Sequence, residues 1–317
     1  MLDITKKWVR QLVDNRSAIR RDTLLGVSYL GDVPRLISPA KGEPAVKSEL
    51  DWHSYNSASE ALAALYQVLV PGQRLSASLG TLVCYPPRTT QENPQMGSSR
   101  WFYINGMATP APTALLNASE LARVFRRPIH LLHTPTWSIW RDLATSITAR
   151  TLRKDGQLSR PAAYVIQQAL EENDKVVLVS HSQGTIVASY IVRKLLRHEA
   201  TRHLVKKLEL YCIGGIADSL EVDVELSEEA GHPVPYVEHF ANGRDYFAEV
   251  GVLSHLDNTE GTVFCIPGRT GHLFNQHYLA GIVRGDYCQR RSRLYHYVRG
   301  REPADTDYVG FEPAEET

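Results

Sequence analysis

The chain has 317 residues, of which 43% are hydrophobic and 22% charged, as in ordinary globular proteins. Its 35 basic residues balance its 35 acidic residues, so no overall charge attracts it to nucleic acid or to an anionic membrane surface. No stretch reaches the roughly 18 consecutive apolar residues of a membrane span. The composition predicts a folded protein that has no transmembrane segment and does not bind nucleic acid.

The first residues, MLDITKKWVRQLVDNRS, are charged throughout and lack the apolar centre and cleavage site of a signal peptide. The four cysteines are widely scattered and have no metal-ligand spacing: Cys84, Cys212, Cys265 and Cys288. We expect buried free thiols in a cytoplasmic protein, or in one exported by a route that needs no N-terminal signal. The sequence predicts neither a metal nor a cofactor.

Residues 1–79 are expected to form a helical region that packs on the core or covers it. Apolar residues recur at helical spacing from Trp8 to Val13 and again from Ala61 to Leu69, and Ser57 precedes the second run as a candidate cap. The apolar stripe of each helix, which includes Leu62 in the second, should be buried against another part of the chain.

Strands and helices alternate over residues 80–298. This alternation predicts a mainly parallel sheet with helices on both faces, in which ligands bind at the carboxyl ends of the strands. Strands are expected at 81–85, 101–104, 129–132, 175–180, 208–213, 236–241 and 262–266. Helices are expected at 113–125, in a broken region over 137–172, at 183–198 and from about 272.

The stretch VVLVSHSQGTIVAS, residues 176–189, passes directly from a predicted strand into a predicted helix. Its centre matches most of the G-x-S-x-G nucleophile elbow, in which a sharp turn exposes a serine hydroxyl above the sheet. Ser182 is the candidate nucleophile and Gly184 the second small residue, whereas Ser180 stands in the place of the first glycine. The helix N-terminus and the Gln183 amide could hold an oxyanion. The alternative is that Ser182 only caps the helix.

With this motif the chain resembles the α/β-hydrolase family over about residues 80–298. In that family the nucleophile, an acid and a histidine follow one another along the chain, which implies the same order here. Asp245 is the expected acid, and Asp218 after the preceding strand is the alternative. His272 is the expected base because it lies in a predicted loop, and His277 within the following helix is the alternative.

The same resemblance implies an oxyanion hole whose second donor follows an earlier strand. In WFYINGMATP, Asn105-Gly106-Met107 is similar to the His-Gly-x segment of many lipases and esterases, with asparagine in place of histidine. The Met107 amide is then expected to act together with the Gln183 amide. A plain Asn-Gly turn is the alternative.

Three further segments bear on the substrate and on the domain limits. Trp137 and Trp140 could line an apolar acyl pocket or form one packed helix face. Residues 214–235 offer only a short connection where many hydrolases carry a lid. The arginine-rich residues 288–301 are expected to form a solvated helix, and residues 299–317 a disordered acidic tail.

These features predict a serine hydrolase of carboxylic esters, with an acyl or lipid ester as substrate and an acyl-enzyme on Ser182. A second hypothesis keeps the acyl-serine but changes the acceptor, giving an acyltransferase or a thioesterase. A third is a hydrolase-like binding protein without activity, for which Ser180 is the sole support. The pattern leaves the acyl chain length and the oligomeric state open.

Overall fold

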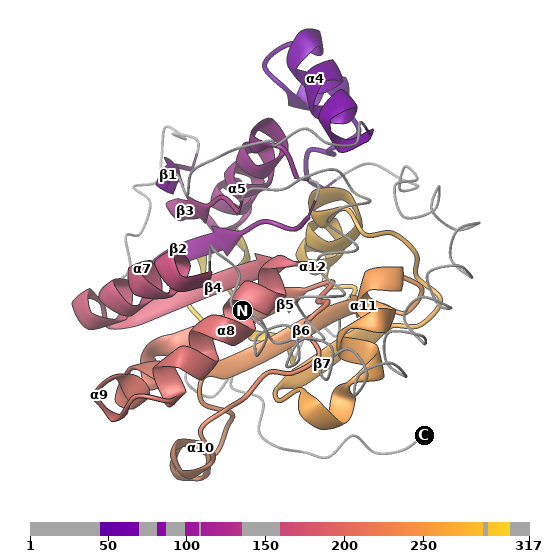
Figure 1. Ribbon diagram of the computed structural model, residues 1–317. Helices are drawn as coiled ribbons and strands as arrows, with labels where there is room; N and C mark the ends of the chain where they lie inside the picture. Colours follow the sequence, from indigo (N-terminus) through magenta and orange to yellow (C-terminus); the bar gives the residue numbers. More distant parts are fainter. Residues whose placement is uncertain are drawn as a thin grey trace, which may run out of the picture.

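The structure is a computed structural model that describes residues 45–69, 81–86, 99–107, 109–134, 159–287 and 291–304. Within them, seven strands form one sheet in the order β1-β3-β2-β4-β5-β6-β7 (Figure 1). The edge strand β1 pairs antiparallel with β3, and every other pair is parallel. The strands are β1 (Thr81–Cys84), β2 (Ser99–Ile104), β3 (Ile129–Leu132), β4 (Lys175–His181), β5 (Leu208–Ile213), β6 (Tyr236–Asn242) and β7 (Thr262–Ile266). The predicted mainly parallel sheet is therefore confirmed.

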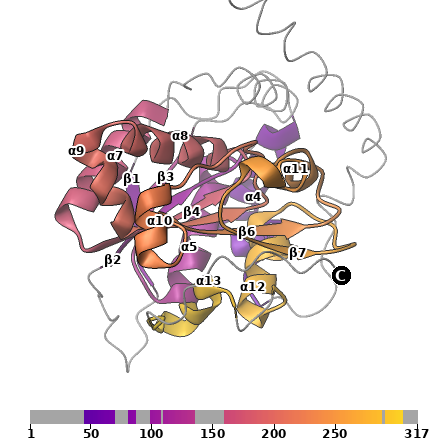
Figure 2. The same ribbon diagram turned by 90° about the horizontal axis from the view of Figure 1, so that it is seen from below.

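Helices cover both faces of the sheet: Figure 2 shows α7, α8 and α9 on one side and α5, α12 and α13 on the other. The α-helices are α4 (Ala58–Leu69), α5 (Ala111–Phe125), α7 (Ser159–Glu172), α8 (Gly184–Leu196), α9 (Glu199–Arg202), α10 (Val224–Ala230), α11 (Tyr246–Val250), α12 (Ala280–Arg284) and α13 (Arg293–His296). The 3₁₀ turns are η2 (Trp52–Ser54), η3 (His203–Lys207), η4 (Val252–Ser254), η5 (Leu256–Asn258) and η7 (Val298–Gly300), and η6 (Phe274–Leu279) is a π-helix.

Successive residues of β4 face opposite cores, because side chains alternate along a strand. Val177 and Val179 join the cluster under α5, η6 and α12, whereas Val176 and Leu178 join the cluster under α7 and α8. A central strand buried on both sides reads as an unbroken apolar run. The pattern that predicted this strand is thus the direct result of its place in the sheet.

The N-terminal part of the described chain meets the expectation only in part. Helix α4 begins at Ala58 after Ser57, whose hydroxyl accepts the Glu60 amide at 3.2 Å, and Val46 lies in the core. Leu62, however, is 67% exposed, so the prediction that this helix buries its apolar stripe is wrong at that residue. The predicted helix from Trp8 to Val13 lies outside the described residues.

The C-terminal segment overturns the expectation of a solvated helix. Arg293, the first residue of α13, is completely buried, and its Nε donates to Glu209 Oε1 at 3.0 Å. Burial raises the pKa of Glu209, but the charges of Lys175 and Arg293 outweigh it and hold that pKa below its ordinary value. The arginine-rich composition of the segment could not reveal this contact, because Glu209 lies on β5, far away in the sequence.

Glu238 on β6 is a second buried carboxylate beside this segment. It accepts the Ser292 hydroxyl at 2.9 Å and the Arg293 amide at 2.5 Å, and burial raises its pKa to about 7. Glu302 binds Arg127 at 2.5 Å, so the start of the predicted tail is attached to the core. Residues 305–317 lie outside the described part.

Two of the three described cysteines, Cys84 and Cys212, are buried as predicted. Cys265 is exposed, because β7 forms the edge of the sheet, and the prediction of a buried thiol is wrong there. Cys288 lies outside the described residues. No helix in the described ranges is both long and apolar enough to cross a membrane.

Replacing Arg293 tests the buried ion pair. Arg293→Ala should lower the free energy of unfolding by about 3 kcal/mol, because the buried Glu209 carboxylate loses this guanidinium and keeps the charge of Lys175 at 3.1 Å. Arg291→Ala, at an exposed position of the same segment, should change it by less than about 0.5 kcal/mol. Urea unfolding measures both, and equal small losses would contradict the role assigned to Arg293.

Candidate active site

Ser182 lies at a tight turn between the end of β4 and the start of α8. Its φ is +51°, a left-handed conformation that is strained for a residue with a side chain. The turn is held because the Ser182 amide donates to the Ile213 carbonyl at 2.9 Å, while its carbonyl accepts the Thr185 amide at 3.0 Å and hydroxyl at 2.7 Å. A strained serine here resembles the nucleophile elbow.

The Ser182 hydroxyl does not cap the helix. Its Oγ is buried and has no hydrogen-bond partner among the described residues, and α8 has Gln183 as its N-cap without any side-chain capping bond. The alternative interpretation of Ser182 as a helix cap is therefore wrong. A buried hydroxyl without a partner is costly, so its retention calls for a functional explanation.

Small residues around Ser182 are required by close backbone contacts. A Cβ on Gly184 would lie 2.8 Å from the Ile104 carbonyl oxygen, and one on Gly106 would lie 2.8 Å from Ser182 Cβ. Ser180, where the motif has glycine, is accommodated because its side chain points toward β5, with Oγ 3.4 Å from the Tyr211 carbonyl oxygen. The departure from the motif leaves the turn intact.

The structure brings Asp245 and His272 together. Asp245 follows β6 and is fully buried as the N-cap of α11, where its Oδ1 accepts the Phe247 amide at 3.0 Å. Its Oδ2 lies 2.6 Å from Nδ1 of His272, in the loop after β7. The far nitrogen of His272, Nε2, is buried and has no partner within the described chain. An imidazole bound at Nδ1 presents Nε2 for proton transfer.

The two alternative residues have other contacts. Asp218 accepts the hydroxyl of the adjacent Ser219 at 3.2 Å. His277 Nδ1 accepts the Leu273 amide at 3.0 Å, and a Cβ on Gly271 would lie 2.4 Å from the His277 ring. His277 thus packs beneath the loop that carries His272 and supports it.

The His272 ring is held between two other rings. The Phe247 ring centroid lies 4.2 Å from that of His272, and the His181 centroid lies 4.8 Å away. Burial, and then the proximity of His272, lowers the pKa of His181 well below its ordinary value, so His181 is neutral and its Nε2 donates to the His272 carbonyl at 2.9 Å. No sequence pattern indicated that Phe247 contacts His272.

The loop after β2 is fixed by the side chain of Asn105. This residue is fully buried, and its Oδ1 accepts the Thr134 amide at 2.7 Å. Its Nδ2 donates to the Gly106 carbonyl at 2.9 Å and to the Thr134 carbonyl at 3.2 Å. These bonds join the carboxyl ends of β2 and β3. The amides of Met107 and Gln183, the two predicted oxyanion donors, donate to no other residue that the structure describes.

A segment from the N-terminal region also contacts the site, which sequence reasoning did not identify. The buried carboxylate of Glu49 accepts the amides of Asn275 at 2.6 Å and Gln276 at 3.2 Å, both in the first turn of η6 after the His272 loop. Burial raises the pKa of Glu49 to about 7, against the lowering effect of these two amides. No spacing in the sequence connects residues so far apart.

Some predicted features are not located by the structure. Trp137 and Trp140 lie outside the described residues. The connection at 214–235 contains α10 (Val224–Ala230). Within the described ranges, no group of three His, Cys, Asp or Glu residues is arranged to hold a metal ion.

Comparison with known proteins finds only remote similarity. No protein-family model matches the sequence, and no curated protein is a significant match. Among solved structures, the chain is similar to EstE1, a carboxylesterase cloned from a metagenomic library, with 10% identity, 76% of this chain and 92% of that chain covered, and a TM-score of 0.40. It is also similar to the esterase LipW from Mycobacterium marinum, with 14% identity, 66% and 76% covered, and a TM-score of 0.30.

The fold assignment rests on the chain's own architecture, because similarities this remote carry no weight. A mainly parallel sheet with an antiparallel strand at one edge, and a strained serine between a central strand and its helix, are the features of an α/β-hydrolase fold. The predicted fold class is therefore confirmed.

The raised pKa of Glu49 makes stability depend on pH. A carboxyl whose pKa rises from 4.5 to about 7 on folding stabilises the fold below pH 4.5, and this contribution is lost as the pH rises through about 7. In the native protein, this carboxyl should lower the free energy of unfolding by up to about 3 kcal/mol between pH 5 and pH 8. Glu49→Gln, which cannot ionise, should lack that decrease. Urea unfolding at both pH values checks this, and an identical decrease in both proteins would contradict it.

Proposed function

We propose that the protein is a serine hydrolase that cleaves carboxylic esters through an acyl-enzyme on Ser182. The observation that carries the proposal is the strained turn at Ser182, whose buried Oγ has no partner among the described residues. The Asp245–His272 pair lies near Ser182, because the ring of His181, the residue before Ser182, contacts the His272 ring. The Nε2 atom of His272 likewise has no partner among the described residues. Free hydrogen-bonding atoms on nucleophile and base are what a substrate would engage.

In the proposed reaction, Ser182 Oγ attacks the ester carbonyl carbon while His272 Nε2 takes the hydroxyl proton. His272 then gives that proton to the leaving alkoxide, so that an alcohol departs and an acyl-serine remains. A water molecule repeats the attack, with His272 again accepting and returning the proton, and a carboxylic acid is released. Asp245 orients the ring and stabilises its positive charge.

The amides of Met107 and Gln183 are proposed to bind the oxyanion of each tetrahedral intermediate. Their freedom from other bonds supports this role, because preorganised donors need no rearrangement when the charge develops. Ser182 Oγ and His272 Nε2 are not hydrogen-bonded to each other. Such contacts are often long without substrate and shorten in the reactive complex.

An apolar acyl group is the proposed substrate portion. Beside the site lies a small apolar cluster that links the loop after β2 to the Phe247 ring, which contacts His272. Its buried members are Met107, Ile216, Tyr246, Phe247 and Val250. Their side chains give the site an apolar side, which supports the proposal of an acyl chain.

Replacing the nucleophile tests the proposal. Ser182→Ala should reduce the kcat/KM for p-nitrophenyl ester hydrolysis by roughly a thousandfold or more and abolish fluorophosphonate labelling, because it removes the attacking oxygen. Ester hydrolysis at several acyl lengths and the mass of the labelled protein are the measurements. Native protein that neither turns over esters nor takes up the label would contradict the proposal.

Ser189→Ala is the matched control for this experiment. Ser189 is a buried serine of α8 whose hydroxyl donates to the Ser219 carbonyl at 2.7 Å. Its replacement should preserve labelling and turnover. Loss of both in this variant would mean that disturbance of the helix, rather than loss of the nucleophile, explains the effect of Ser182→Ala.

Asn105→Ala tests the oxyanion loop. Without the amide side chain the loop that carries Met107 loses three hydrogen bonds, so kcat should fall by about 10- to 100-fold while KM changes little. Thr134→Val is the control, because it keeps the backbone amide that binds Asn105 and removes only the long contact of the Thr134 hydroxyl to the Asn105 carbonyl at 3.4 Å. Steady-state kinetics measure both, and an equal kcat in Asn105→Ala and native protein would argue against this loop.

A further inference from the structure

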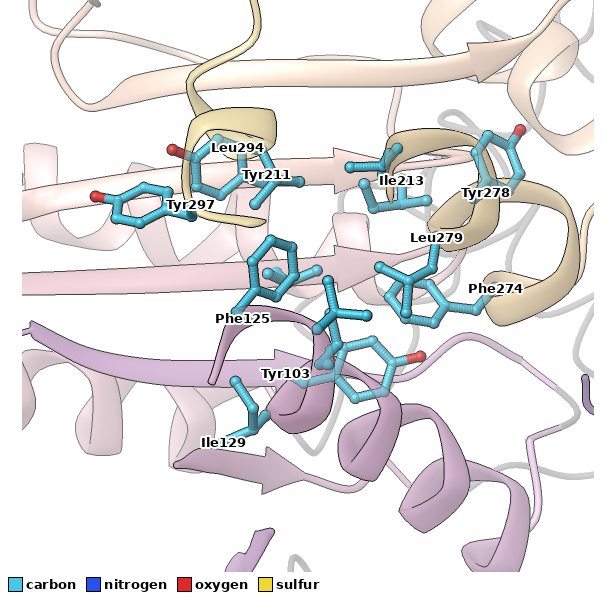
Figure 3. Packing of buried hydrophobic residues seen from close by; sticks show 14 of the residues in the cluster. Tyr103, Phe125, Ile129, Tyr211, Ile213, Phe274, Tyr278, Leu279, Leu294 and Tyr297 are labelled. Atoms are coloured by element: carbon cyan, nitrogen blue, oxygen red, sulfur yellow. The ribbon is translucent and has the colours of Figure 1, made fainter. Parts of the chain in front are cut away.

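Tyr278, in η6, binds the carboxylate that orients His272. The ring is fully buried, and Figure 3 shows its hydroxyl turned away from Leu279 and Phe274. The hydroxyl donates to Asp245 Oδ2 at 2.6 Å and accepts the Asn242 amide at 3.1 Å. Because an amide can only donate, the phenol proton is directed to the carboxylate.

Asp245 Oδ2 is therefore shared between two donors, the Tyr278 hydroxyl and His272 Nδ1, each at 2.6 Å. Burial, followed by the charge of Asp245, raises the pKa of Tyr278 well above its ordinary value, so the phenol stays protonated. A hydrogen bond to a carboxylate stabilises its charge and weakens its attraction for another proton. The phenol thus competes with the imidazolium for the same oxygen.

We propose that Tyr278 is a positioning residue that lowers the proton affinity of His272 by sharing Asp245 Oδ2. Its importance for catalysis rests on the proposed function, but its effect on the His272 ring does not. A base of lower proton affinity remains neutral, and ready to accept the serine proton, over a wider pH range.

Tyr287 offers a matched control. Its ring is stacked on that of Tyr278, with centroids 6.3 Å apart and an interplanar angle of 9°. Its hydroxyl donates to Asn242 Oδ1 at 2.5 Å and makes no bond to Asp245. Removing either phenol oxygen disturbs the same layer, but only Tyr278 contacts the carboxylate.

Other titratable or charged groups surround the pair. They are His181 at the end of β4, Cys265 on β7, Arg269 in the loop after it, His277 in η6, Asp286 and Tyr287 after α12, and Glu49 of the N-terminal segment, which accepts amides from the first turn of η6. Arg269 is paired with Asp286 at 2.8 Å. Apart from Tyr287, these groups affect the proton affinity of His272 in both tyrosine variants, so comparing Tyr278→Phe with Tyr287→Phe cancels their effect.

The experiment is an NMR titration of protein with ring-labelled histidine. The chain has 12 histidines, and His272→Gln identifies the His272 signal. In Tyr278→Phe the midpoint of the His272 titration should rise by roughly half a pH unit to one unit, because the carboxylate loses a competing donor. In Tyr287→Phe it should not shift.

An unchanged or lower midpoint in Tyr278→Phe, or an equal rise in both variants, would overturn the proposal. Should Tyr278→Phe not fold, 3-fluorotyrosine at position 278 keeps the ring and makes the hydroxyl a stronger donor, and the midpoint should then fall. With a p-nitrophenyl ester, the acidic limb of the pH–rate profile should move with the midpoint. A shifted midpoint in a protein without turnover would refute the proposed function and leave the role of Tyr278 standing.

Discussion

The close contact between α8 and the end of β2 is the constraint on which the site depends. A side chain at Gly184 would overlap the carbonyl oxygens of residues 104 and 105, so the helix can begin only as close as glycine permits. Two residues earlier, Ser182 has the left-handed conformation that turns the chain from β4 into this closely packed helix. The same contact therefore lies beside the Ser182 hydroxyl, the Gln183 amide and the loop after β2, the three parts that the proposed reaction uses.

Around that turn, the polar groups are arranged in layers. Asp245 binds His272, and Tyr278 and the Phe247 amide bind Asp245. His272 is further held through its carbonyl by His181 and through its ring by Phe247. Both carboxylate oxygens and Nδ1 of the pair thus have partners, whereas His272 Nε2, the atom that the proposed reaction uses, has none within the described chain.

The sequence predicted the sheet well because its signals are local. Residues 129–132, 208–213 and 262–266 were predicted with the bounds that the structure has, since buried parallel strands are short apolar runs limited by turn residues. Asp245 and His272 were predicted because each lies in the loop that follows such a strand, and this can also be read from a short stretch of sequence. Their roles in catalysis stay predictions.

What the sequence could not predict depends on contacts between distant residues. Nothing near Glu49 indicates that it binds the helix after His272, and the run of arginines before Arg301 looks like a solvated surface. Whether such a residue is buried is decided by its partner, and that partner is visible only in three dimensions. The Tyr278 contact to Asp245 belongs to the same class.

The burial of Arg293 has a consequence for synthesis of the chain. Glu209 and Glu238 enter the core on β5 and β6, yet the guanidinium that pairs with Glu209 and the backbone amide that binds Glu238 come from the last part of the polypeptide. Until that segment has been synthesised, Glu209 can pair with Lys175 but not with Arg293, and Glu238 lacks the Ser292 hydroxyl and the Arg293 amide. The buried carboxylates of the inner strands therefore gain these partners only once the C-terminal segment has been made, which favours late completion of the packing around them.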